Sequence, residues 1–206
     1  MEKNKNISKS KIARIISDVI SPPLVYALMG FFLSWSELSF WDGLIWGIIY
    51  GFFVSLVPVI AVFYLYKNGK VQDMHISRTE QRRLPYLLSI FGAVFVIIFL
   101  VLFEGPKFLL LLAICNFLGL SILFTVNFFW LISSHMASIC MASFLLTILF
   151  GYRVGLYSIP LVLMVFWART YLRRHSTLQL IAGMIVGIMS VIIFIGFGGT
   201  TTILTL

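Results

Sequence analysis

Charged residues and cysteines are scarce in this sequence. Only 11% of its 206 residues are charged and only seven are acidic, whereas soluble domains carry about 25% charged residues. The two cysteines, Cys115 and Cys140, lie in apolar runs, which excludes a disulfide framework and a cysteine-rich zinc site. A membrane prenyltransferase is also disfavoured, because its magnesium diphosphate site needs paired aspartate-rich motifs and Asp73 stands alone.

Apolar residues are abundant instead, at 61% of the chain. A membrane-spanning helix needs about 20 of them, and apolar stretches cover approximately 20–38, 44–66, 86–103, 108–130, 136–150, 155–168 and 180–199. We therefore predict an all-α fold, a polytopic transmembrane helix bundle with six or seven spans. Pro58 and Pro160 are expected to kink their helices. The stretches 136–150 and 155–168 are short, so a tilted pair and a re-entrant hairpin both stay open for them.

Residues 1–19 differ in character from the rest of the chain. Lys3, Lys5, Lys9, Lys11 and Arg14 alternate there with isoleucines, which predicts a basic amphipathic segment at a membrane surface. Residues 20–206 form the transmembrane domain. The net charge of +8 is expected to attract anionic lipid headgroups or phosphorylated substrates, and not nucleic acid, because so apolar a chain lies in a bilayer. No pattern sets the oligomeric state.

The basic residues are distributed unequally between the two sides of the membrane. With seven spans, all but two of the 15 lysines and arginines fall on the side of the N-terminus, and only Lys107 and Arg153 fall on the other. The positive-inside rule places the N-terminal side in the cytoplasm.

All three histidines fall on this same basic side. They are His75, His135 and His175, and they are accompanied by Arg78, Arg82, Arg83 and Arg169. Ionisable groups near a bilayer cost free energy unless they are paired or solvated, so their convergence predicts a cavity for an anion. On charge alone, arginines that snorkel to lipid headgroups explain the pattern equally well.

The spacing of these residues defines three short segments. In the last segment His175 follows Arg169 after five residues, and Gln179, Gly183 and Gly187 then recur at every fourth position. This spacing predicts one helix face from His175 to Gly187, with the glycines allowing close packing. In the middle segment Ser133 or Ser134 is a candidate N-cap ahead of His135, so the positive helix end would face an anion. The first segment contains Arg78 and Arg82, shortly before Pro85.

At these residues the sequence resembles the type 2 phosphatidic acid phosphatase (PAP2) superfamily, which includes the vanadium haloperoxidases, and within it a short bacterial membrane branch. The segment from Ile132 to His135 resembles the family's Pro-Ser-Gly-His motif with Pro and Gly replaced. The segment from Ala168 to Gln179 resembles Ser-Arg, five residues, His, three residues, Asp, with Ser and Asp replaced at unaltered spacing. Arg78, Arg82 and Pro85 match the first motif only loosely.

The resemblance implies a PAP2-like core and a phosphatase that needs neither metal nor cofactor. His175 would attack phosphorus to form a phosphohistidine, and His135 would protonate the leaving oxygen. The phosphate would be bound by Arg78, Arg82, Arg169, Ser133 and Ser134. Gln179 replaces the family aspartate, so it can orient His175 but not stabilise its positive charge, a deficit on the order of 1–2 kcal/mol.

The expected function is hydrolysis of a phosphomonoester or pyrophosphate of a membrane lipid. Phosphatidic acid, phosphatidylglycerophosphate and polyprenyl diphosphate all stay open as substrates. The resemblance favours the plasma (inner) membrane of a prokaryote, and the charge distribution favours an active site on the cytoplasmic side. The alternative is a PAP2-like protein that has weak or no activity because of Gln179, and that binds or transports a phosphorylated lipid.

Overall fold

The computed structural model describes residues 2–70 and 83–196, and every regular element in this part of the chain is helical. The elements are α1 (Glu2–Val19), α2 (Pro22–Glu37), α3 (Phe40–Gly51), the π-helix η1 (Phe52–Leu56), α4 (Val57–Lys67), α5 (Arg83–Leu102), α6 (Lys107–Val126), α7 (Ser134–Phe150), α8 (Tyr152–Tyr171) and α9 (Thr177–Phe194). The all-α fold class is confirmed for the described residues, and the PAP2-like core stays a prediction.

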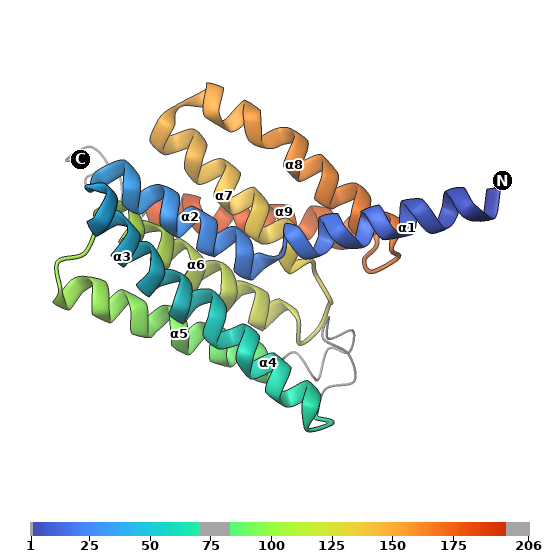
Figure 1. Ribbon diagram of the computed structural model, residues 1–206, viewed down its shortest axis with the longest axis horizontal. Helices are drawn as coiled ribbons and strands as arrows, with labels where there is room; N and C mark the ends of the chain where they lie inside the picture. Colours follow the sequence, from blue (N-terminus) through green and yellow to red (C-terminus); the bar gives the residue numbers. More distant parts are fainter. Residues whose placement is uncertain (1, 71–82, 197–206) are drawn as a thin grey trace.

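The predicted apolar stretches form helices that run along the long axis of the molecule in alternating directions (Figure 1). Among the described residues, five helices are long and apolar enough to cross a membrane. They are Phe40–Lys67, which joins α3, η1 and α4, and also α5, α6, α8 and α9. A sixth span results if Ser8–Val19 and Pro22–Glu37, which meet at a bend of 49°, count as one. By length and composition the described residues therefore provide five or six of the predicted six or seven spans.

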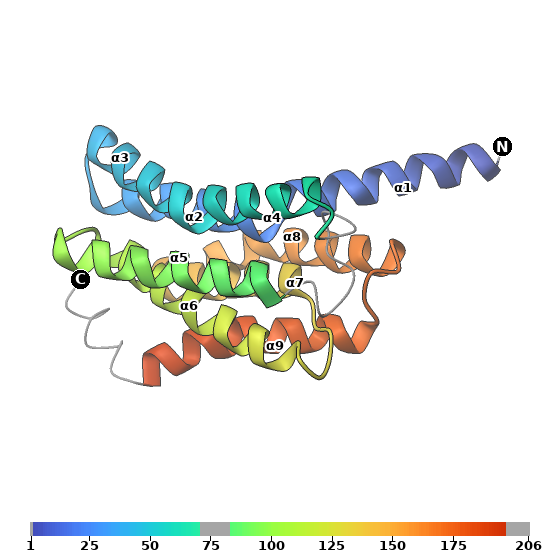
Figure 2. The same cartoon turned by 90° about the horizontal axis from the view of Figure 1, so that it is seen from below.

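Helix α7 lies in the centre of the bundle. It is an apolar helix of 17 residues, below spanning length, and it contacts α2, α6, α8 and α9. Figure 2 shows α2 to α4 on one side of the bundle and α9 on the other, with α7 between them. Only Gly151, at φ +88°, separates α7 from α8, a backbone angle that favours glycine. Helix α8 reaches spanning length alone and α7 does not, so a tilted pair and a re-entrant hairpin both stay open for the stretches 136–150 and 155–168.

Two glycines bring α9 into close contact with α7, as their spacing predicted. A Cβ atom on Gly183 would collide with the carbonyl oxygen of Ser133, and one on Gly187 would collide with that of Ala137. Only glycine allows two helix backbones to approach so closely. This packing fixes the start of α7 against α9.

The expected kink at Pro58 takes the form of the π-helix η1, which ends one residue before the start of α4 at Val57. Pro58 lacks an N–H group and its ring displaces the carbonyl group four residues earlier, at Val54, so a wider turn relieves the clash. The turn bulges toward α5, where a Cβ on Gly92 would lie 2.8 Å from the Phe53 carbonyl oxygen. Pro160, by contrast, lies inside α8, which continues through it as one helix.

The charge asymmetry corresponds to the two ends of the bundle. One end of the bundle, on the right in Figure 1, is formed by helix α1, the end of α4, the start of α5, and the connections α6–α7 and α8–α9. We call this the basic end; within the described residues 8–70 and 83–196 it carries Lys9, Lys11, Arg14, Lys67, Lys70, Arg83, Arg169, Arg173 and Arg174. The opposite end carries Lys107 and Arg153.

Candidate functional site

The side chain of Arg169 is buried on the last turn of α8, with only 3% of its surface exposed. Its Nη1 atom donates a hydrogen bond of 2.9 Å to the hydroxyl oxygen of Ser17 on α1, which is also buried. A guanidinium in this position does not snorkel to lipid headgroups. Burying its charge requires hydrogen-bond acceptors or an anion nearby, so Arg169 is placed as an anion-binding group would be.

The N-terminus of α7 lies beside it. Ser133 is the N-cap, as one of the two predicted alternatives, and its hydroxyl accepts a hydrogen bond of 3.4 Å from the Met136 N–H. Ser134 and His135 follow as the first two residues of the helix. The N-terminal end of a helix has N–H groups without partners in the helix and a partial positive charge. Both would attract an anion to this side of the site.

His135 is oriented by the end of α1. Its Nε2 atom lies 3.2 Å from the backbone carbonyl oxygen of Ser17. A carbonyl oxygen only accepts hydrogen bonds, so Nε2 carries the hydrogen and, in the neutral ring, Nδ1 carries the lone pair. Ser17 therefore contacts both candidate groups, Arg169 through its hydroxyl and His135 through its carbonyl.

A proline pair explains why α1 ends here. Pro22 and Pro23 have no N–H groups, so the carbonyl groups of Asp18 and Val19 lose the donors that a continuous helix would supply. The helix stops at Val19, and α2 starts again at Pro22, a residue suited to the first position of a helix. The break leaves the negative end of α1 facing Arg169 and His135.

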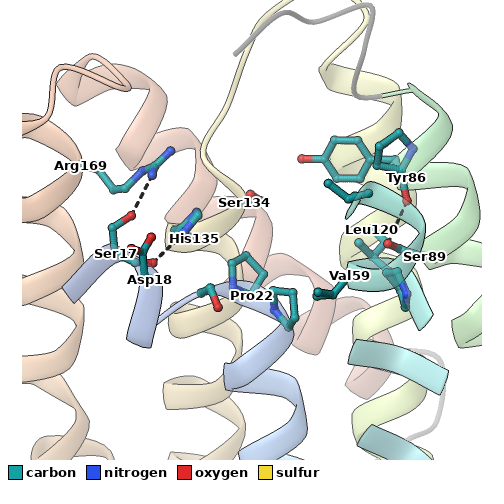
Figure 3. A pocket seen from close by; sticks show the side chains of 15 residues that line it. Ser17, Asp18, Pro22, Val59, Tyr86, Ser89, Leu120, Ser134, His135 and Arg169 are labelled. Atoms are coloured by element: carbon teal, nitrogen blue, oxygen red, sulfur yellow. Dashed lines mark hydrogen bonds between the residues drawn. The ribbon is translucent and has the colours of Figure 1, made fainter. Parts of the chain in front are cut away.

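These elements surround a cavity of about 510 Å³ (Figure 3). It is lined by Ser17, Asp18, Ser21, Pro22, Pro23, Pro58, Val59, Val62, Pro85, Tyr86, Ser89, Leu120, Ser134, His135 and Arg169. In Figure 3 the ionisable side chains Arg169, Asp18 and His135 lie at one side, and Tyr86, Ser89 and Leu120 lie at the other. A polar end joined to a largely apolar wall matches a lipid headgroup followed by its chain.

His175 and Gln179 are placed differently from the prediction. Ser176 is the N-cap of α9, so His175 precedes the helix and does not share a face with Gly183. The prediction of one helix face from His175 is wrong, because Ser176 and Gln179 form a capping box that starts the helix there. The Gln179 Oε1 atom accepts a 2.9 Å hydrogen bond from the Ser176 N–H. His175 is 6% exposed, and neither His175 nor Gln179 lines the cavity.

Two of the three predicted segments nevertheless meet in space. The Ser133 N–H donates a hydrogen bond of 3.2 Å to the Gln179 carbonyl oxygen, which joins the starts of α7 and α9. The Arg174 N–H donates to the Arg169 carbonyl oxygen at 3.1 Å and closes the turn that leads to His175. The segments of His135 and of Arg169 to Gln179 are thus adjacent, as the anion-cavity prediction requires.

The first predicted segment lies only partly within the described residues. Arg78 and Arg82, both predicted to bind phosphate, lie outside them, as does His75. Pro85 is described, on the first turn of α5, and it lines the cavity. Arg83 is described as the first residue of α5, and its guanidinium stacks on the Phe128 ring at 4.5 Å from the ring centroid. This contact ties α5 to the connection between α6 and α7 beside the cavity.

Sequence reasoning missed the contribution of α1 to this site, and that of Tyr86 on α5. Ser17 and Asp18 line the cavity from α1, and Tyr86 lines it from α5. The Tyr86 hydroxyl accepts a 3.2 Å hydrogen bond from the Asn127 side chain, whose Oδ1 atom accepts in turn from the Ile132 N–H at 3.0 Å. The Pro22–Pro23 pair was the available signal for Ser17 and Asp18, because it predicts a helix end at the basic side.

Within residues 8–70 and 83–196, no group of three or more His, Cys, Asp or Glu side chains is arranged to hold a metal ion.

No family model, no curated protein and no solved structure matches the chain. Membership of the PAP2 superfamily therefore rests on the motif residues alone and stays a prediction.

Proposed function

We propose that this integral membrane protein binds the phosphate of a membrane lipid in the cavity at the basic end and hydrolyses it. The observation that supports this is the burial of the Arg169 guanidinium next to His135 and the N-terminus of α7, in a cavity that is polar on one side and apolar along its wall. The substrate is a phosphomonoester or pyrophosphate whose chain lies against Pro22, Val59 and Leu120.

The binding step uses groups that are already in place. A phosphate oxygen replaces the Ser17 hydroxyl as the acceptor for Arg169, whose planar guanidinium suits bidentate phosphate contacts. The Ser134 hydroxyl and the N–H groups at the start of α7 contribute further donors. Arg78 and Arg82 are proposed to complete the charge neutralisation.

The transfer step is that of the resembled family. A neutral His175 nitrogen attacks phosphorus, the bond from phosphorus to the lipid oxygen breaks, and His135 donates a proton to that oxygen. Water then attacks the phosphohistidine, with His135 accepting its proton, which releases phosphate and restores His175. Gln179 acts as the orienting group for His175. The step requires His175 to reach a phosphate held by Arg169.

A second candidate, binding or transport without turnover, is favoured by one observation. The side-chain oxygen Oε1 of Gln179, which would orient His175, accepts a hydrogen bond from the Ser176 N–H, and His175 is not among the lining residues. A protein of this kind retains the arginines and loses the reaction.

Phosphate release by the purified protein tests the proposal. Phosphatidic acid, phosphatidylglycerophosphate and a polyprenyl diphosphate are offered with and without a chelator, and release that the chelator does not change is expected for at least one. The variant His175→Ala should lose release and keep binding, while Gln179→Asp should keep or raise release. Normal release by His175→Ala would end the enzyme proposal, and saturable binding without release by the wild type would establish the second candidate.

Binding by Arg169 is tested with a matched control. Arg169→Gln should weaken lipid phosphate binding by roughly 100-fold, as expected for the loss of a buried charged contact. Arg153→Gln removes an exposed arginine from the opposite end, where its guanidinium contacts the exposed Tyr152, and should leave binding unchanged. Equal affinities for the two variants would refute the assignment of Arg169.

The remaining parts of the proposal concern location. We propose the plasma membrane of a prokaryote, with the basic end in the cytoplasm. Helix α1 is proposed to contact anionic lipid headgroups, since Lys9, Lys11 and Arg14 are exposed on it together with Ile12 and Ile15.

A further inference from the structure

The last three turns of helix α1 present three different surfaces. Ala13 and Ser17, one turn apart, are buried, and the main neighbour of α1 in the bundle is α8. The exposed surface is partly apolar and partly basic. Its apolar residues recur at helical spacing and are about half exposed: Ile12, Ile15 and Val19. Its basic residues are Lys9, Lys11 and Arg14, and the acidic Asp18 follows them at the cavity.

The length of α2 places these basic residues at the depth of lipid headgroups. Helix α2 has 16 residues and is therefore about 24 Å long, whereas the hydrocarbon core of a bilayer is about 30 Å thick. Taken with α1 as one broken span, the crossing is completed by the break and the last turn of α1. Lys11 and Arg14 then lie one to two turns further out. Figures 1 and 2 show α1 extending beyond the bundle at this end.

A lipid headgroup layer with negative charge fits this surface. Basic side chains at the edge of a bilayer are attracted to anionic lipids, and the apolar residues beside them suit the boundary of the hydrocarbon core. The exposed part of α1 is thus complementary to an anionic leaflet in both charge and polarity.

The same helix holds two candidate groups of the site. Ser17 lies one turn after Arg14, and its hydroxyl and carbonyl contact Arg169 and His135. The break before Pro22 separates α1 from α2, so the position of Ser17 depends on how α1 itself is held. A helix moves as a rigid unit over one or two turns, and a contact at Lys11 or Arg14 is therefore transmitted to Ser17.

We propose that anionic lipid headgroups bind the basic residues of α1 and activate the site by holding Ser17 against His135. The inference rests on the proposed function in one respect, namely that His135 takes part in phosphate release. The activating lipid is not the substrate, because its headgroup stays on α1 outside the cavity. In a bilayer without anionic lipids, only the packing of α1 on the bundle positions Ser17, and His135 is oriented less of the time.

The first measurement tests the contact of α1 with anionic lipids. Cys115 and Cys140 are buried, so a thiol-reactive, environment-sensitive fluorophore labels Ile15→Cys selectively in the folded protein. The labelled protein is placed in nanodiscs of phosphatidylcholine, with or without phosphatidylserine. We expect a shift of the emission to shorter wavelength with phosphatidylserine, because α1 is then drawn into the headgroup layer.

The second measurement tests the regulation. Phosphate release from the three lipid phosphates named above is measured in the same two kinds of nanodisc with the unlabelled full-length protein. We expect phosphatidylserine to raise kcat about tenfold, which is part of the 100-fold or more that a positioned acid–base group contributes. KM should change little, because the proposed effect is on the orientation of His135 and not on the attraction of the substrate.

A matched pair of double variants separates α1 from the charge of the protein as a whole. Lys9→Gln combined with Lys11→Gln should lose the emission shift and most of the gain in kcat, because each lysine contributes about fivefold to binding at an anionic surface. Lys67→Gln combined with Lys70→Gln removes two exposed lysines at the end of α4, also at the basic end. This second pair should keep both effects.

The outcomes separate the regulation from the proposed function. The regulation is overturned if the Lys9 and Lys11 pair keeps the full gain in kcat, or if the Lys67 and Lys70 pair loses as much of it. It is also overturned if the emission at position 15 shifts while kcat stays constant. In these cases phosphate release itself stands. If none of the three lipids is hydrolysed in either bilayer, the proposed function is wrong, and the regulation is overturned with it.

Discussion

Replacing Gly183 by alanine tests the close contact between α9 and α7 that positions His135. The added Cβ would collide with the Ser133 carbonyl oxygen and lie 3.2 Å from the Met136 Cβ. Both neighbours belong to the start of α7, and one of them is backbone, so the contact is relieved only by moving the helix end. Overpacking of this kind costs about 1–3 kcal/mol, against a gain of about 1 kcal/mol for alanine over glycine inside a helix.

Gly51→Ala is the matched control for this prediction. Its Cβ would lie 3.7 Å from the Ala27 Cβ, an ordinary van der Waals distance, so this variant keeps the gain in helix propensity without the clash. The expected difference in stability between the two variants is therefore the overpacking term, about 1–3 kcal/mol. For a chain of this size, each kcal/mol of this difference lowers the melting temperature of Gly183→Ala by about 2–4 °C relative to Gly51→Ala.

The assay uses the thiols that the protein already contains. Cys115 and Cys140 are buried, so a thiol-reactive fluorophore in detergent solution reports their exposure as the protein unfolds on heating. Phosphate release should fall by about 10–100-fold in Gly183→Ala, because small displacements of catalytic groups cost rates of this order. Equal melting temperatures and equal activities for Gly183→Ala and Gly51→Ala would refute the argument.

Three further predictions concern the frame around the site. Glu37→Ala should lower stability by about 1–2 kcal/mol in the same thermal assay. The Glu37 carboxylate accepts hydrogen bonds from the Lys107 and Phe108 N–H groups at the start of α6, and alanine removes this cap. A melting temperature equal to that of the wild type would contradict this prediction. Tyr86→Phe should lower stability by about 1 kcal/mol through loss of the Asn127 hydrogen bond, whereas Tyr66→Phe, at an exposed position, should not. A cysteine at position 75 should resist an impermeant thiol reagent in intact cells and react after lysis, and ready labelling of intact cells would place the basic end outside.

The helix bundle could be predicted from the sequence, because apolar length and proline position act locally. The predicted stretch 44–66 falls within Phe40–Lys67, and the pair Pro22–Pro23 ends α1 by removing two N–H donors. The number of spans is less well determined by length, since α7 is apolar but short. Its length is explained by its central position, because a helix covered by four others does not need to meet lipid along a full bilayer.

The candidate site could be predicted only in part. Arg169, Ser134 and His135 line one cavity, because their segments end at the same side of the membrane and topology brings such ends together. The Pro22–Pro23 pair predicts that α1 ends near Ser17, but the contacts of Ser17 with Arg169 and His135 could not be predicted, since they join residues more than 100 positions apart. The error at His175 has a local cause: the spacing of four was compatible with a helix, but the capping box makes Ser176 the N-cap, so α9 starts at Thr177, two residues after His175.

The Ser17 hydroxyl and a bound phosphate would compete for the same hydrogen bond from Arg169. This competition predicts that a substitution at Ser17 lowers stability and tightens binding. The Ser17 hydroxyl accepts the hydrogen bond that a phosphate would take from Arg169. Ser17→Ala therefore removes an acceptor from a buried guanidinium and destabilises the empty protein by about 1–3 kcal/mol, whereas the phosphate-bound protein has already given up that contact.

The difference in free energy must appear in binding. By linkage, destabilising only the unbound state tightens binding by the same amount, so Ser17→Ala should bind phosphatidic acid roughly 5–150-fold more tightly while melting at a lower temperature without ligand. Fluorescence titration and thermal unfolding of the same preparation measure both. If the variant instead binds more weakly, the Ser17 hydroxyl is a phosphate ligand itself, and the replacement of Ser17 by phosphate at Arg169 is wrong.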